Sequence, residues 1–271
     1  MVEPPTSRRA WHGSGDFVGV LARLRQALEH FAEQGAGCVV VGGDLVHRGE
    51  TDAMAEVMRT LGEASAPVLL VSGNHDVTGD PDRLRSAIDQ ATDRKLELAA
   101  IDGIERDGLR IAGVQVGQTK DWFHARLREI PATGAWGSRP LVLVSHYPVL
   151  SLARRLTAAG FRYPGDLLDR QPLAHRLVDH RAPVVVLSGH VHARATVKSG
   201  TALQLSAGAL VEPPYECAIV DIDAVADGSI VVRRRCQRLL AEWRAREPVF
   251  VPDDESWRFD GDRWINGAVR S

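Results

Sequence analysis

The sequence has few cysteines and no pair of them at metal-binding spacing. Its 271 residues include three cysteines, Cys38, Cys217 and Cys236, and none belongs to a Cys-x-x-Cys motif. An odd number of cysteines without that spacing argues against both a disulfide framework and a zinc ribbon. Cys38 lies in an apolar run, which is typical of a small buried side chain.

The chain also lacks a long apolar run and an excess of charge of one sign. No stretch of roughly 18 apolar residues occurs, so we expect no transmembrane helix. Residues 1–15 carry charges but not the apolar core of a secretory signal. Lys plus Arg total 33 and Asp plus Glu total 35, for a formal net charge of −2. These features predict a globular cytoplasmic protein with no membrane partner and no global attraction to nucleic acid.

Hydrophobic periodicity indicates alternating helices and strands in the first third of the chain. Helical spacing begins near Asp16 and continues to Phe31, and it returns over residues 54–61 and after Pro81. Short apolar runs at 38–41 and 68–71 are typical of buried strands. Further strands are expected at 111–116, 141–144, 184–187, 203–206, 218–222 and 230–233, with helical segments within 151–180. This order predicts a layered α/β domain with at least one mostly parallel sheet.

The C-terminal stretch has a different composition. After Arg233 it is basic, and Leu239, Leu240 and Trp243 have the spacing of a helical apolar face. We therefore expect one domain over residues 1–232, followed by a C-terminal helix and tail over 233–271. The helix would pack on the core with a solvated basic face, or it would serve as a phosphate contact or a dimer arm.

Polar side chains of metal-ligand type follow several of the predicted strands. Ligand sites in open α/β sheets collect at the carboxyl ends of the strands, where the loops converge. Carboxylate, amide and imidazole groups together suit divalent ions such as Mn, Fe or Zn. A single polar residue at the end of a strand ordinarily caps a helix or forms a turn. Helix caps and turns do not explain why so many such residues follow the predicted strands. The residues are Asp44, Asn74, His146, His190 and His192.

The motifs that contain these residues resemble those of the calcineurin-like metallophosphoesterases, in the same order along the chain. The resemblance covers roughly residues 16–223. It implies a four-layer α/β/β/α sandwich of two mixed β-sheets flanked by helices. The motifs are Gly43-Asp44 with Gly49, Gly73-Asn74-His75-Asp76, Ser145-His146 and Gly189-His190-Val191-His192.

The resemblance also implies that the five polar residues named above, Asp44, Asn74, His146, His190 and His192, are metal ligands. Asp44 would bridge two divalent ions. Asn74, His146 and His190 would complete the ligands of one ion, and His192 would bind the other.

Three more residues acquire catalytic roles by the same resemblance. His75 would lie over the scissile phosphate as a general acid or charge stabiliser, oriented by Asp76. Arg48 would contact the phosphate, although His47 stands where the family usually has an aspartate. The implied activity is hydrolysis of phosphate esters, most of all diesters, by a metal-activated hydroxide. Cyclic nucleotides, nucleic acid and small phosphoesters stay open as substrates, with a cyclic-nucleotide phosphodiesterase and a repair-type nuclease as the two enzyme branches.

The sequence departs from the family pattern at its start. The family normally opens with a strand that carries Asp-x-His, and that motif is absent before Asp44. One ion would keep four ligands and the other only Asp44 and His192, so we expect one strong site and one weak or empty site. Loss of a strand would expose a neighbouring strand and invite pairing with another chain, including a homodimer. A truncated chain, a mononuclear enzyme and a degenerate, non-catalytic metal-binding or interaction scaffold are the three interpretations left open.

Overall fold

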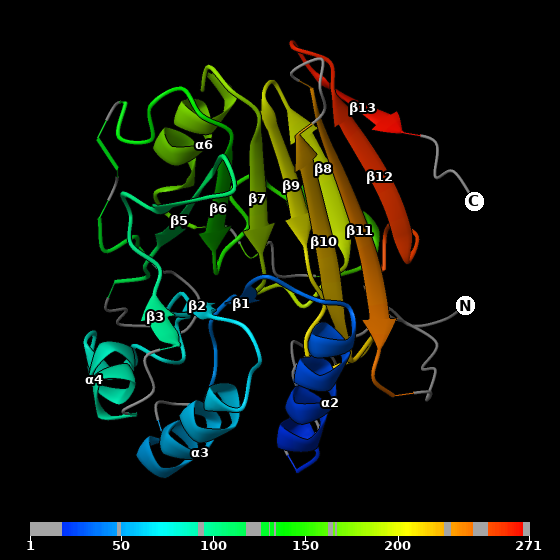
Figure 1. The fold of residues 1–271 in the computed structure, drawn as a ribbon. Helices are drawn as coiled ribbons and strands as arrows, with labels where there is room; N and C mark the ends of the chain where they lie inside the picture. Colours follow the sequence, from blue (N-terminus) through cyan, green and yellow to red (C-terminus); the bar gives the residue numbers. More distant parts are fainter. Residues whose placement is uncertain are drawn as a thin grey trace.

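The computed structural model describes residues 18–47, 50–91, 95–117, 126–129, 131–132, 134–161, 165, 167–224, 229–240 and 249–267. Two layers of β-structure pack face to face in this part of the chain, with helices on both outer sides (Figure 1). The α/β class and the four-layer α/β/β/α arrangement expected from the sequence are therefore confirmed.

The six-stranded sheet forms one β-layer, and its strand order is β4-β5-β6-β7-β9-β8. Its four central strands are parallel, whereas β4 and β8 run antiparallel at the edges. Parallel central strands read as continuous apolar runs because both of their faces are covered. The strands are β4 (Ile104–Arg106), β5 (Leu109–Val114), β6 (Leu141–Ser145), β7 (Val184–Ser188), β8 (Ala195–Ser199) and β9 (Ala202–Ser206).

Side chains alternate between the two faces of this sheet. Leu143 and Val186 join a core with Leu173 and Leu177 from one helix on the outer side, whereas Val144 packs toward the other β-layer. This period of two is that of a pleated strand. The helices that follow β6 are α5 (Ala153–Ala158) and α6 (Arg170–Val178).

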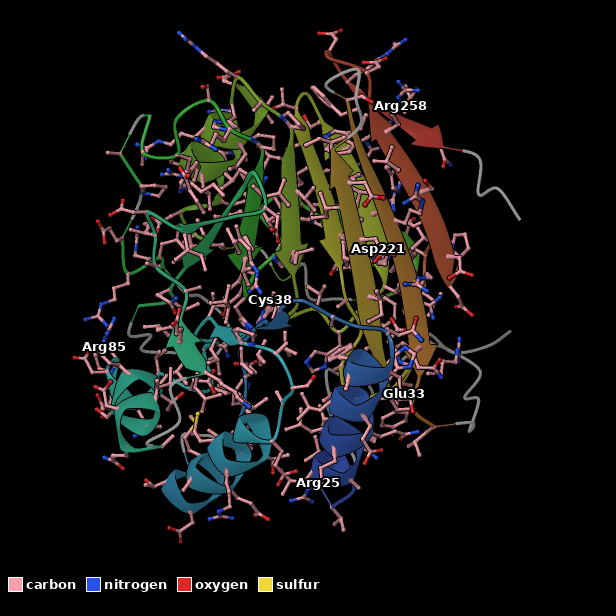
Figure 2. The ribbon with its side chains drawn as sticks, in the orientation of Figure 1. Arg25, Glu33, Cys38, Arg85, Asp221 and Arg258 are labelled. Atoms are coloured by element: carbon pink, nitrogen blue, oxygen red, sulfur yellow. The ribbon has the colours of Figure 1, made fainter. Side chains whose placement is uncertain are left out.

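A short parallel sheet forms part of the second β-layer, with strand order β1-β2-β3. Apolar side chains of three helices cover its outer face, among them Leu28, Met58 and Leu84. Figure 1 shows these helices together on one side of the three strands. Arg25 and Glu33 face outward (Figure 2), whereas Arg23 of the same helix is buried. The elements are α2 (Val20–Glu33), β1 (Val39–Val41), α3 (Thr51–Gly62), β2 (Val68–Leu70), α4 (Arg83–Gln90) and β3 (Leu96–Leu98).

An antiparallel meander completes the second β-layer, and it corrects the expectation of a C-terminal helix directly after Arg233. The meander comprises β10 (Glu216–Ala224), β11 (Ile230–Arg238), β12 (Asp254–Phe259) and β13 (Trp264–Gly267). Residues 233–238 continue β11. Burial there alternates with a period of two, as in a strand: Val232 and Arg234 are buried, and Arg233 and Arg235 are exposed.

The expected division of the chain at residue 232 consequently falls inside a strand. The strands on its two sides, β10 and β12, both pair with β11 in one sheet. Trp243, which was expected on the helix, lies outside the described residues.

The second β-layer is not hydrogen-bonded throughout. It consists of two hydrogen-bonded sheets, in which β1 is the edge strand of one and β10 the edge strand of the other. Both pack against the same six-stranded sheet, β1 and β2 through Val40 and Leu69, and the meander through Val232 and Trp264. The layer is thus interrupted between β1 and β10.

None of the helices in the described segments has both the length and the apolar character needed to cross a bilayer.

A buried ion pair joins the six-stranded sheet to the meander. Arg194 is fully buried just before β8, and its guanidinium donates to the Glu216 carboxylate, with Nη2 2.6 Å from Oε2 and Nε 3.1 Å from Oε1. It also donates to Asp253. The pair therefore ties three segments together that are distant in sequence.

We expect the Glu216→Ala substitution to lower the free energy of unfolding by about 3–5 kcal/mol, because it leaves a buried guanidinium without its main partner. Urea denaturation followed by circular dichroism measures this loss. Glu105→Ala is the matched control, since Glu105 pairs with Arg110 at the surface and its removal should change stability little. Equal effects of the two substitutions would contradict the prediction.

Candidate metal centre

Four polar side chains converge where four parallel strands end. Asp44 follows β1, Asn74 follows β2, His146 follows β6 and His190 follows β7. The first two strands belong to one β-layer and the last two to the other, so the site lies where the two layers meet at their carboxyl ends. The predicted meeting of these residues at strand ends is what the fold produces.

His146 is at the middle of this cluster. Its Nε2 atom lies 3.2 Å from Asp44 Oδ2, 3.1 Å from Asn74 Oδ1 and 3.1 Å from His190 Nδ1. One ligand atom each from Asp44, His146 and His190 lies within 4.8 Å of the others. Asn74 and His146 are each only 2% exposed. The arrangement is compact enough for one ion to reach all four side chains.

The backbone at this centre adopts left-handed conformations that only glycine adopts readily. Asp44 has φ of 56°, His190 of 62° and His192 of 48°. Non-glycine residues in this region cost free energy, and they concentrate at functional sites where the surrounding structure holds them in place. The strain here affects three of the five residues that the sequence indicated as metal ligands.

Hydrogen bonding determines which atoms of the cluster carry lone pairs. His146 Nδ1 lies 2.7 Å from the carbonyl oxygen of Gly42, so this nitrogen carries the proton and donates it. A histidine that binds a metal through one ring nitrogen usually donates a hydrogen bond from its other ring N–H to a group such as a backbone carbonyl. Nε2 then points at the oxygens of Asp44 and Asn74 at hydrogen-bond distance, and positive charge at this place, as a proton on Nε2 or as a cation, satisfies both. When Nε2 is neutral, its lone pair and these oxygens form a donor set that fits a divalent cation.

The pKa directions agree with a site that attracts positive charge. Burial by itself would raise the pKa of Asp44, but the neighbouring His146 reverses this and holds it below the usual range. Burial would lower the pKa of His146, and the Asp44 carboxylate raises it instead. Burial and the nearby His146 lower the pKa of His190 well below its ordinary value. His190 is therefore neutral at physiological pH, which is the form that binds metal.

Asp76 holds two loops of the site together. Its fully buried carboxylate accepts hydrogen bonds from four backbone N–H groups, at 2.8 Å from Asp44, 2.8 Å from Leu45, 3.3 Å from Val46 and 2.8 Å from Gly73. Burial and the Asp44 carboxylate raise the pKa of Asp76 to about 7, against the N–H donors that favour its charged form. The structure gives Asp76 a supporting role. Its orientation of His75 stays a prediction.

His75 lies beside the cluster. Its backbone N–H donates to Asp44 Oδ1 over 2.9 Å, and its ring stacks on that of His47 with centroids 5.0 Å apart. The position is compatible with a role toward bound substrate. Arg48, the other residue expected to contact phosphate, lies outside the described residues.

His192 lines the same cavity as Asp44 and His190, but it is not part of the tight cluster of ligand atoms. Its Nδ1 lies 2.8 Å from Glu212 Oε2, and Glu212 is buried. A carboxylate bound to one ring nitrogen fixes the tautomer and directs the other nitrogen outward as a ligand. That one ion has a complete set of ligands and a second ion an incomplete set stays a prediction.

Sequence analysis missed three supports of the centre. They are the Gly42 carbonyl, the Glu212 carboxylate and the Tyr147 ring, whose centroid lies 3.8 Å from that of His190. Tyr147 directly follows the predicted ligand His146 in the sequence, so its place next to the centre could have been predicted. Glu212 lies in a loop 20 residues beyond His192, and no pattern in the sequence around it predicts a contact with that histidine.

Gly73 makes the close approach of two loops possible. A Cβ atom at this position would overlap with Asp44 Oδ1 and lie 2.7 Å from Asp44 Cγ. We expect Gly73→Ala to displace the Asp44 carboxylate, to lower the free energy of unfolding by about 1–3 kcal/mol and to weaken metal binding. Gly42→Ala is the control, because no heavy atom lies within 4 Å of its added Cβ. Denaturation and metal titration of both variants check the prediction, and unchanged binding in Gly73→Ala would contradict it.

Comparison with known proteins assigns the family. A family model described as calcineurin-like phosphoesterase matches residues 12–194, which is more than half of the chain. The chain is 27% identical over 156 residues to the glycerophosphodiester phosphodiesterase GpdQ of Enterobacter lignolyticus (strain SCF1), an alignment that covers 52% of this chain. It spans about half (49%) of the length of that curated relative.

A solved structure supports the fold. The crystal structure of TT1561 of Thermus thermophilus superposes with a TM-score of 0.51, at 16% sequence identity, over 74% of this chain and 88% of that one. The matched family is metal-dependent, and the cluster of Asp44, His146 and His190 provides a His/Asp site of the kind that such chemistry needs. The chain therefore belongs to the calcineurin-like phosphoesterase family.

Proposed function

We propose that this protein is a phosphodiesterase that hydrolyses small phosphate diesters, with a divalent ion held by Asp44, Asn74, His146 and His190. The observation that carries the proposal is the convergence of the other three side chains on His146 Nε2 within 3.1–3.2 Å. The name of the GpdQ relative supports diesters as the substrate class. Mn, Fe and Zn all suit this mixture of nitrogen and oxygen ligands.

The residues divide between binding the ion and acting on the substrate. A divalent ion held at this centre would supply Lewis-acid charge to a phosphate oxygen. His192, supported by Glu212, would provide one ligand toward a second, weaker ion. His75 lies next to the centre and would donate a proton to the departing alkoxide, and the adjacent His47 ring holds its plane in place.

A substrate panel tests the proposal. The chain is stripped with a chelator, reloaded with Mn²⁺ and given bis-p-nitrophenyl phosphate, p-nitrophenyl phosphate, cyclic AMP and single-stranded DNA. We expect turnover of the diester bis-p-nitrophenyl phosphate above that of the monoester. Metal bound without turnover of any substrate would overturn the proposal in favour of a non-catalytic scaffold. Preference for cyclic AMP or DNA would redirect the substrate class within the same enzyme family.

A further inference from the structure

Main-chain atoms of the two β-layers contact each other near the carboxyl end of β5. The Gly113 N–H of β5 donates to the oxygen of Ala100, just after β3, over 2.9 Å. A Cβ atom at Gly113 would overlap with the Ala99 Cβ and lie 2.9 Å from Val71 Cγ1, so no side chain fits between the layers here. Packed sheets are ordinarily about 10 Å apart. This junction therefore holds the two layers at a fixed, short separation.

The Gln115 side chain, just beyond β5, reinforces the junction with hydrogen bonds from both ends of its carboxamide. Its Oε1 accepts from the Ser72 N–H over 2.8 Å, and its Nε2 donates to the Ala99 oxygen over 2.8 Å. Ser72 lies just after β2 and Ala99 just after β3, so one side chain holds the ends of two strands of the other layer. A carboxamide suits this place because it is donor and acceptor at once and carries no charge.

The same segment holds Ser72 a second time. The Val116 N–H donates to Ser72 Oγ over 3.0 Å, and Ser72 is only 4% exposed. Ser72 leads directly into the loop that carries Asn74, and Gly73 between them leaves no room for a Cβ atom beside the Asp44 carboxylate. A displacement of Ser72 would therefore reach two proposed ligands, Asn74 through the chain and Asp44 through contact.

We propose that Gln115 is a positioning residue of the metal centre, which sets the distance between the ligands of one β-layer and those of the other. Asp44 and Asn74 follow strands of the three-stranded sheet, whereas His146 and His190 follow strands of the six-stranded sheet. An ion needs all of its ligands in place at once, so a shift between the layers would open the site. The inference rests on the proposed ion at this centre but not on the hydrolysis of a substrate.

Gln115→Met tests the proposal on the full chain, because methionine keeps the length of the side chain and loses both hydrogen bonds. We expect its affinity for Mn²⁺ to fall at least about tenfold, the effect typical of losing a group that supports metal ligands. Titration of the chelator-stripped protein with Mn²⁺ measures the fall.

Thr201→Val is the matched control for lost hydrogen bonding. Thr201 Oγ1 donates to the Leu177 oxygen over 2.8 Å, and Thr201 directly precedes β9, at the end of the sheet away from the metal centre. This variant should bind Mn²⁺ as the parent does. Ser72→Ala is a milder test that keeps the Ser72 N–H and removes only the contact with Val116, so it should lower the affinity for Mn²⁺ by a smaller factor than Gln115→Met.

Hydrogen exchange in the stripped protein gives a readout that needs no metal. In Gln115→Met, exchange should become faster at residues 44–46 and 72–76, which the Asp76 carboxylate links, and stay unchanged in β10. General destabilisation would instead quicken exchange throughout the protein.

The outcomes separate this inference from the proposed function. Parent affinity for Mn²⁺ in folded Gln115→Met or in folded Ser72→Ala overturns the positioning role, and so does exchange that becomes faster evenly along the chain. A parent protein that binds Mn²⁺ but hydrolyses no phosphodiester contradicts the proposed function alone. A parent that binds no Mn²⁺ contradicts both.

Discussion

The substitution His146→Ala should empty the metal centre and abolish phosphodiester hydrolysis. His146 Nε2 is the atom on which Asp44, Asn74 and His190 converge, and its Nδ1 is already positioned by the Gly42 carbonyl. Loss of an outer-shell partner typically costs 10–100-fold in metal affinity, so we expect loss of a direct ligand to exceed about 100-fold. Elemental analysis of the reconstituted protein and titration with Mn²⁺ measure the effect.

A matched histidine variant serves as the control. His175 lies exposed on α6, away from the strand ends, and His175→Ala should retain the metal content of the parent. Circular dichroism must show that His146→Ala is folded, since the residue is buried. A folded His146→Ala protein that holds the parent amount of metal would show that the ligand assignment is wrong.

The substitution His75→Ala should lower kcat by about 10²–10⁴-fold while metal content stays at the parent level. The magnitude is that of a positioned general acid. The metal should remain because the hydrogen bond from position 75 to Asp44 Oδ1 comes from the backbone N–H, which alanine keeps. Steady-state kinetics on bis-p-nitrophenyl phosphate and elemental analysis of the same sample check the two halves of the prediction.

His47→Ala separates the proton-donating role from simple packing. His47 stacks on His75, so its removal should loosen the ring and reduce kcat by less than the removal of His75 itself. If His75→Ala loses its metal, His75 contributes to the centre rather than to proton transfer. If both variants keep full activity, neither imidazole takes part in the reaction.

The candidate site was predictable to a large extent because its residues occupy local patterns. Asp44, Asn74 and His146 each follow a short apolar run within a few residues, and such runs are typical of buried strands. Parallel strands bring their carboxyl ends to one edge, so a polar residue at each end predicts a shared site without knowledge of the strand order. The roles of His75 and Asp76 came instead from the resemblance to the family, because both residues follow Asn74 in one of its motifs.

Contacts between residues far apart in the chain could not be predicted by this reasoning. Glu212 contacts His192 from a loop with no periodic pattern, and the carboxylate of Asp76 supports backbone N–H groups some 30 residues earlier in the chain. The stretch after Arg233 was expected to be helical because the spacing of Leu239, Leu240 and Trp243 favours a helical apolar face. Pairing with β10 and β12 overrode that preference, and the buried Arg234 is tolerated in the strand because the Glu255 carboxylate lies 3.0 Å away.

The amino-acid sequence by itself determined the α/β class, the order of the early helices and strands and the identity of the converging ligands, because each depends on short-range periodicity and on what ends a strand. Only the tertiary structure decided that the second β-layer is interrupted between β1 and β10, that the C-terminal segment is a meander, and which carbonyl and carboxylate groups orient the histidines. Those features arise from hydrogen bonds between segments far apart in the chain, and no local pattern carries information about such partners.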